Sequence, residues 1–207
     1  MSPRPYDLGS RRQQIDEGRR RVLDASRSLL REATRYTAFT LDEVAKRADV
    51  ARATVYYQFG SKTGLLEALC DDLAVAGQMS ELARAFTMAE PSEALHAFVA
   101  CFVRFWDVDR IVMRRLRALG ALDPDVGAVI AGRDERRRQG LAVLVGRTAQ
   151  GDGAFDPAER DRVAGMLYAL TSFETFDALA GADRTPADVV PDLVALARAV
   201  LALLEPG

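Results

Sequence analysis

The side chains best suited to chemistry in this 207-residue chain lie in one short segment, residues 52–59. Val55 and Phe59 are four residues apart and give a helix here a narrow buried stripe, so its other side chains point outward. They are Arg52, Ala53, Thr54, Tyr56, Tyr57 and Gln58. This face has two adjacent tyrosines and no acid, which is unusual for mere solvent exposure. Arginine recognises guanine edges, small residues contact thymine methyl groups and tyrosine hydroxyls bind phosphates, so we predict a DNA recognition helix.

A second short helix is predicted just before it. Thr40 is a candidate N-cap and Glu43 stands three residues later, which is the pattern of a capping box. Phe39 and Val44 flank the cap as a hydrophobic staple. One apolar face follows at helical spacing, formed by Leu41, Val44, Ala45 and Ala48. The two helices therefore form a helix-turn-helix.

The turn between these helices and the start of the next one are also marked. Asp49 is one of the few non-glycine residue types that adopt a left-handed turn conformation at modest cost. Ser61 is an N-cap candidate, and Lys62 stands at the first helical position, where the helix dipole disfavours a cation. A phosphate would reverse that penalty, so we predict that Lys62 binds the DNA backbone. The alternative is a solvated lysine.

Residues 19–69 resemble the tetracycline-repressor (TetR) family of bacterial transcriptional regulators. The pattern that carries the resemblance consists of Thr40, Ala45, Ala48, Val50, Thr54, Tyr56, Phe59, Ser61, Lys62 and Leu65. Two positions depart from it, since Asp49 stands where the family usually has glycine and Ala51 where it often has serine or threonine. Neither departure breaks the motif.

The resemblance implies a role for each matching side chain. Thr40 and Lys62 would contact phosphates, and Tyr56 and Tyr57 the backbone or base edges. The residues implied to contact bases are Arg52, Ala53 and Thr54.

The charge is distributed unevenly along the chain. Its net charge is −2, yet residues 1–62 contain 13 Lys and Arg against 8 Asp and Glu, and the remainder contains 15 against 22. Attraction to phosphate is therefore concentrated where the motif lies.

A 49% hydrophobic composition without a long apolar run or signal core indicates a globular cytoplasmic protein that does not bind membranes. Cys70 and Cys101 lack metal-type spacing and are expected to be buried thiols.

We expect an all-α chain with three parts. Residues 1–14 lack helical periodicity and form a flexible arm, whose arginines could enter a minor groove or add only weak nonspecific attraction. Residues 15–62 form a three-helix head, in which the first helix buries Val22, Ala25, Leu29, Leu30 and Ala33. Residues 63–207 form a larger helical domain for ligand binding and dimerisation. Its predicted helices are 62–78, 91–107, 109–120, 124–149, 157–181 and 186–204, with a loop at 150–155.

A cluster of large side chains in the second domain is either ordinary core or the lining of a ligand pocket. Its members are Phe98, Phe102, Phe105, Trp106, Met113, Leu116, Met166, Tyr168 and Phe173, all of which except Tyr168 we select as pocket residues. His96, the only histidine, is structural or a hydrogen-bonding group of the pocket. Glu174 and Asp177 interrupt an apolar helix, so they recognise a cationic ligand, pair with arginines across a dimer or face solvent.

The last two predicted helices carry apolar residues at heptad-like spacing. They are Val163, Met166, Leu170 and Phe173 in one helix and Val189, Leu193, Leu196, Val200 and Leu203 in the other. These seams could pack within their own domain or pair with a second copy as a four-helix interface, and the TetR resemblance implies the second arrangement. A dimer would also place two recognition helices on two half-sites.

These observations favour a dimeric regulator that binds an inverted repeat in double-stranded DNA and is released by an unknown small-molecule effector. An activator, a ligand-independent regulator and a partner-binding module with a vestigial head are the alternatives, although the intact recognition face disfavours the last. The chain offers no positioned nucleophile, metal-ligand motif or glycine-rich phosphate loop, so we expect no enzyme activity, no metal site and no cofactor.

Overall fold

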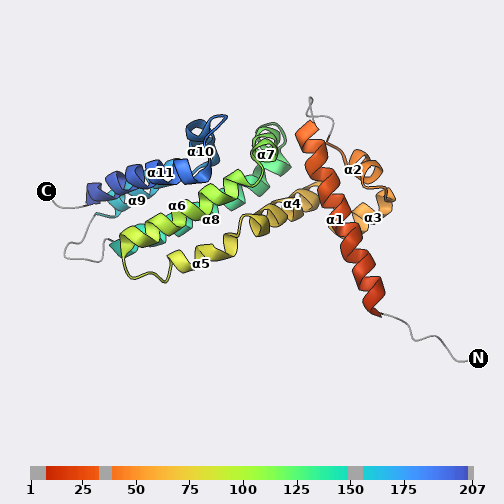
Figure 1. Cartoon of the computed structure of the whole chain (residues 1–207), viewed down its shortest axis with the longest axis horizontal. Helices are drawn as coiled ribbons and strands as arrows, with labels where there is room; N and C mark the ends of the chain where they lie inside the picture. Colours follow the sequence, from red (N-terminus) through yellow and green to blue (C-terminus); the bar gives the residue numbers. More distant parts are fainter. Residues whose placement is uncertain (1–7, 33–38, 149–155, 205–207) are drawn as a thin grey trace, which may run out of the picture.

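The computed structural model describes residues 8–32, 39–148 and 156–204, and all regular structure in these ranges is helical. Figure 1 shows an elongated molecule whose N-terminal helices lie at one end. These are α1 (Leu8–Glu32), α2 (Leu41–Arg47) and α3 (Arg52–Phe59). The predicted all-α class with an N-terminal helix-turn-helix is confirmed.

The remaining helices form a larger bundle that α4 joins to the head (Figure 1). They are α4 (Lys62–Ala76), the 3-10 helix η2 (Met79–Glu81), α5 (Leu82–Ala85), α6 (Pro91–Asp107), α7 (Arg110–Leu122), α8 (Pro124–Thr148), α9 (Pro157–Leu170), α10 (Phe173–Ala180), α11 (Pro186–Leu201) and η3 (Ala202–Leu204). Four of them, α6, α8, α9 and α11, begin with proline at their predicted first residues. Asp156 Oδ1 accepts from the Ala158 amide and Thr185 forms a capping box with Asp188, whereas α6 has no side-chain cap.

The prediction of a single helix over residues 157–181 is wrong. Helix α9 ends at Leu170, with Thr171 as its C-cap, and a separate helix, α10, begins at Phe173. The Ser172 hydroxyl accepts from the Thr175 amide and so begins α10 as its N-cap. The buried Thr171 hydroxyl instead bonds back to the Leu167 carbonyl at 2.9 Å. Gly181, at a φ of 54°, ends α10. Two short elements, η2 and α5, were not predicted at all, since seven residues are too few to show a period.

The N-terminal boundary also differs from the prediction. Helix α1 begins at Leu8 rather than at residue 15, so half of the predicted arm is helical. Residues 13–17 are all exposed, and such a helix end depends on propensity rather than on an apolar face. That is why periodicity missed it. Residues 1–7, and the predicted loop at 150–155, lie outside the described residues.

The predicted hydrophobic staple and left-handed turn of the head are formed, and the capping box is formed in part. Phe39 and Val44 are both buried as the staple requires, and Thr40 Oγ1 accepts from the Glu43 amide at 3.2 Å. The reciprocal bond from the Glu43 side chain is not formed, so only half of the capping box exists. Asp49 has a φ of 50°, which places it in the left-handed region. Ala51 N-caps α3 without a side-chain hydrogen bond, a consequence of its departure from the family pattern.

The head is tied to the bundle by charged contacts as well as by α4. Arg31 of α1 lies 2.7 Å from Asp109 Oδ2, a carboxylate whose side chain is 4% exposed. The other Asp109 oxygen accepts from the Val112 amide and caps α7. Asp109 therefore connects α1 of the head with the start of α7.

Helix α6 lies at the centre of the bundle core. Phe98, Phe102 and Trp106 form a continuous aromatic row along it, and the Trp106 indole donates to the Thr171 carbonyl at 3.0 Å. Both cysteines are buried free thiols, as predicted. Within the described ranges, no helix combines the length and apolar character needed to cross a bilayer.

Candidate DNA interface and ligand cavity

The predicted recognition residues share one face of α3. Arg52, Ala53, Tyr56 and Tyr57 are exposed, and their spacing of one, three and one residues puts them side by side on a helix. Thr54 is half-buried beside them. Tyr57 is 88% exposed, which is extreme for an aromatic ring in a folded chain. The exposed ring favours a face that a partner covers.

Arg52 is held in place by two neighbours. Its Nε lies 2.9 Å from Asp42 Oδ1 of α2, and its Nη2 donates to the Tyr56 hydroxyl at 3.1 Å. The pair with Asp42 is exposed on both sides and is therefore worth little, so a guanine edge can displace the carboxylate at small cost. Asp42 thus positions the guanidinium without trapping it.

Thr40 is exposed at the N-terminus of α2 and is engaged as the cap of that helix. A capping hydroxyl sits among free backbone amides, which is a favourable place for a phosphate oxygen. The structure therefore leaves the predicted phosphate contact of Thr40 sterically open.

Lys62 is not a free lysine. Its ammonium donates to Asp123 Oδ2 at 2.9 Å, and about a third of each side chain is exposed. The Lys62 ammonium also holds the pKa of the Asp123 carboxyl below its ordinary value. Asp123 simultaneously accepts from the Asp125 and Val126 amides at the start of α8. Any contact between Lys62 and DNA must therefore compete with a carboxylate of the bundle.

We expect Asp123→Asn to raise DNA affinity about two- to fivefold, because Asn retains the helix cap while releasing Lys62 from a charge pair of up to about 1 kcal/mol. Fluorescence anisotropy with a DNA site selected by the protein measures this. Asp125→Asn is the control, since Asp125 makes no ion pair within the described part of the chain. Equal affinities for the wild type and Asp123→Asn would show that Lys62 does not contact DNA.

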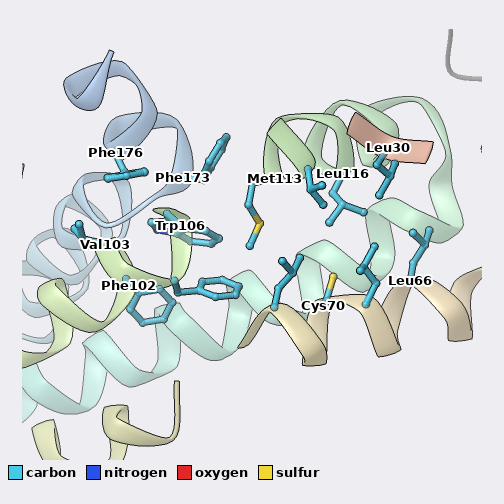
Figure 2. Close-up of a cluster of buried hydrophobic side chains, with 14 of the residues drawn as sticks. Leu30, Leu66, Cys70, Phe102, Val103, Trp106, Met113, Leu116, Phe173 and Phe176 are labelled. Carbon is cyan, nitrogen blue, oxygen red and sulfur yellow. The ribbon is translucent and has the colours of Figure 1, made fainter. Parts of the chain in front are cut away.

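A cavity of about 250 Å³ lies in the bundle between α4, α6, α7 and α8. Figure 2 shows Phe102 and Trp106 on one side of this region and Met113 and Cys70 on the other. The apolar lining consists of Cys70, Ala74, Met79, Leu82, Phe102, Phe105, Trp106, Met113, Leu116 and Ile130. Burial raises the pKa of the Cys70 thiol, so this side chain is an uncharged part of the wall.

Five of the eight predicted pocket residues line this cavity, and their role in binding a ligand stays a prediction. They are Phe102, Phe105, Trp106, Met113 and Leu116. The other three lie elsewhere. Phe98 is fully buried a turn before Phe102, Phe173 packs behind Trp106 with ring centroids 5.8 Å apart, and Met166 is 37% exposed on α9. Spacing alone could not tell which faces of α6 and α9 turn toward the cavity.

The charged residues that line the cavity were not predicted from the sequence. They are Arg117, Arg133, Asp134, Arg136 and Arg137, four of them on α8. The signal was the spacing of Ile130, Arg133, Asp134 and Arg137, which shares one helical face.

The surroundings of His96, Glu174 and Asp177 differ from those that the sequence predicted. His96 is exposed on α6 and does not line the cavity, so it is not a pocket group. Asp177 accepts two 2.7 Å hydrogen bonds from Arg114, and Glu174 pairs with Arg117. Both acids therefore bind arginines of α7 in their own chain, an arrangement that none of the predicted alternatives described.

Comparison with known proteins addresses the head directly. The sequence model described as "Bacterial regulatory proteins, tetR family" matches residues 22–69, the part that contains α2, α3 and the capped start of α4. The N-terminal head therefore belongs to the TetR family. The HTH-type transcriptional regulator AlkX of Mycobacterium tuberculosis is 33% identical over 112 residues, which cover 54% of this chain and 46% of that relative. The match thus spans less than half the length of this curated relative.

Solved structures share the fold along most of the chain. The TetR family regulator PfmR of Thermus thermophilus has a TM-score of 0.62 at 20% identity, covering 90% of this chain and 100% of PfmR. A TetR regulator of Haloarcula marismortui has a TM-score of 0.65 at 15% identity, covering 91% and 98%. A protein of Saccharomonospora viridis in complex with choline has a TM-score of 0.64 at 20% identity, covering 88% and 96%. The chain therefore shares the fold of these proteins along most of its length.

Proposed function

We propose that this TetR-family protein is a transcriptional repressor that binds an inverted-repeat operator as a homodimer and releases it when a small molecule fills the cavity. The observation that carries the proposal is the position of α4. This helix begins at Lys62 beside the recognition helix and contributes Cys70 and Ala74 to the cavity wall.

The distance along α4 is short. Cys70 lies eight residues after Lys62, which corresponds to roughly 12 Å of helix axis. A helix this short moves as a rigid element, so a ligand that displaces Cys70 or Ala74 also displaces the start of α4 and the α3 that packs on it. Ligand and DNA would then disfavour each other by the same coupling free energy, about 1–3 kcal/mol.

The comparisons support the proposal indirectly, because they concern the family of the head and a small molecule bound by a neighbour, not the release of DNA. The matched head belongs to a family of regulatory proteins, and the neighbour from Saccharomonospora viridis holds a small molecule, choline. An apolar cavity with a few charged groups is the usual form of a small-molecule site.

Filling the cavity tests the coupling without knowledge of the ligand. We expect Ala74→Phe to weaken operator binding about tenfold, because a phenyl ring on α4 occupies the cavity as a ligand would. A cavity of about 150 Å³ in another protein accepts benzene, so 250 Å³ suffices. Anisotropy titration with selected DNA measures the change, and the emission of Trp106, a wall residue, reports whether the ring has entered.

Val75→Phe provides the matched control, since Val75 follows on the same helix and is 79% exposed. It should leave DNA binding unchanged. If Ala74→Phe alters Trp106 emission and yet binds DNA as tightly as the wild type, the cavity does not control the head.

The proposed dimer uses the exposed sides of α9 and α11, not the whole predicted seams. Val163, Val189 and Leu193 are at most 1% exposed, because α9 and α11 pack on each other and on the bundle. The seams therefore mainly serve the core of one subunit. Met166 and Leu196 remain 37% and 45% exposed on these helices, and large exposed apolar residues favour an interface.

We expect the double variant Met166→Glu/Leu196→Glu to sediment as a monomer at concentrations at which the wild type is a dimer, because buried unpaired carboxylates oppose association. Analytical ultracentrifugation distinguishes the two states. Val75→Glu introduces the same charge at an exposed apolar residue of α4 and should leave the dimer intact. A dimeric double variant would place the interface elsewhere.

A further inference from the structure

The charged part of the cavity wall is strongly basic. Four arginines, Arg117, Arg133, Arg136 and Arg137, line the cavity, and Asp134 is the only acid among the lining residues of the described chain. Asp134 is already shared, since it lies 3.0 Å from Arg117 and 3.3 Å from Arg137. Arg136 makes no ion pair with any described residue. Arg117 also pairs with Glu174, and Arg133 lies 2.6 Å from Asp71, so four arginines meet three carboxylates and the excess of one positive charge lies on the exposed Arg136.

The buried guanidinium of Arg137 lacks one hydrogen-bond acceptor among the residues that the structure describes. Its side chain is 1% exposed, and its Nη1 donates to the Tyr168 carbonyl and the Thr171 hydroxyl at 2.6 and 2.9 Å. Its Nε is buried and has no hydrogen-bond acceptor within the described protein. The buried Nε of Arg133 is in the same condition. Burial lowers the pKa of the Arg137 guanidinium, as expected for a cation with too little compensating charge.

A cation in this cavity would add repulsion from the arginines, and a neutral apolar molecule would leave the excess positive charge uncompensated. A carboxylate would supply the missing negative charge, since carboxylates are the natural partners of guanidinium groups. The apolar wall formed by Phe102, Trp106 and Met113 would hold the rest of such a molecule.

We propose that the effector is a small organic anion, with an apolar body against the aromatic wall and a carboxylate among the arginines of α8. This inference rests on the proposed function only in calling the molecule an effector. Binding itself can be tested without DNA, because Trp106 is the only tryptophan of the chain and lines the cavity.

Three probes of one chain length separate the head groups: octanoate, octanol and octyltrimethylammonium. Titration of Trp106 emission should show octanoate binding at least tenfold more tightly than either of the others. Arg136→Gln and Arg133→Gln should each weaken octanoate about tenfold and leave octanol unchanged. Arg138→Gln is the matched control, because Arg138 follows on α8, pairs with Glu135 and does not line the cavity.

Equal or tighter binding of octyltrimethylammonium would overturn the inference. So would octanoate binding that is insensitive to both arginine variants, or the absence of any emission change with octanoate. A separate anisotropy titration with selected DNA isolates the proposed function. Octanoate that binds the wild type through Arg133 and Arg136 but releases no DNA would support the ligand class and contradict the release mechanism.

Discussion

Gly64→Ala is expected to lower the free energy of unfolding by about 3 kcal/mol, although it adds a single methyl group. A Cβ built on Gly64 would lie 2.1 Å from the carbonyl oxygen of Phe59, and that neighbour is backbone that cannot rotate away. Gly64 lies in the first turn of α4, where its amide donates to the Ser61 hydroxyl cap at 3.0 Å. A side chain here must therefore separate the end of α3 from the start of α4.

Denaturant unfolding followed by circular dichroism measures this loss of stability. Gly132→Ala is the matched control, because Gly132 is a helical glycine of α8 whose added Cβ would meet nothing within 4 Å. That variant should keep the wild-type stability or gain up to about 1 kcal/mol from better helix propensity. Equal unfolding curves for Gly64→Ala and the wild type would mean that α3 and α4 do not approach as closely as described.

Arg52→Ala is expected to produce the largest loss of DNA affinity among the exposed recognition residues, about 1–3 kcal/mol or roughly 5- to 150-fold. The loss should be greatest for the preferred sequence and small for nonspecific DNA, because arginine is the side chain of α3 suited to bidentate contact with guanine. Lys62→Ala should instead weaken all sequences alike and lower the salt dependence by about one counterion. Tyr56→Phe should also act on all sequences.

Anisotropy titrations at several salt concentrations, with preferred and scrambled DNA, separate these effects. Arg84→Ala is the control for loss of an exposed arginine, since Arg84 is 72% exposed on α5, outside the head. If Arg52→Ala and Arg84→Ala bind the preferred sequence equally well, the reading face has been assigned to the wrong side of α3.

Much of the fold could be predicted because its signals are local. The Thr40 cap, the Phe39 staple and the left-handed Asp49 each depend on a few neighbouring residues, and prolines mark the helix starts of the bundle. The break at Thr171 was missed because Thr171 and Ser172 differ little from helix-compatible residues in sequence. The contacts that accompany the break come from other helices, since Arg137 donates to the Thr171 hydroxyl and the Trp106 indole donates to the Thr171 carbonyl.

The recognition face was easier to predict than the cavity lining, because it depends only on neighbouring residues. The recognition face follows from helical spacing within eight residues. The Lys62–Asp123 pair joins residues 61 positions apart, and the arginines of the cavity face it only because α8 packs on α4 and α7. The heptad spacing of α11 was real, but apolar spacing cannot distinguish a partner subunit from the same subunit's α6.

Selection of preferred sites from a random DNA pool tests the central claim most directly, because it needs no knowledge of the operator or the effector. The account predicts enrichment of an inverted repeat by the wild-type protein, and altered base preference at symmetric positions in both half-sites for Arg52→Ala. The absence of any enriched sequence at low salt would contradict it and indicate a helical partner-binding protein whose head no longer recognises DNA.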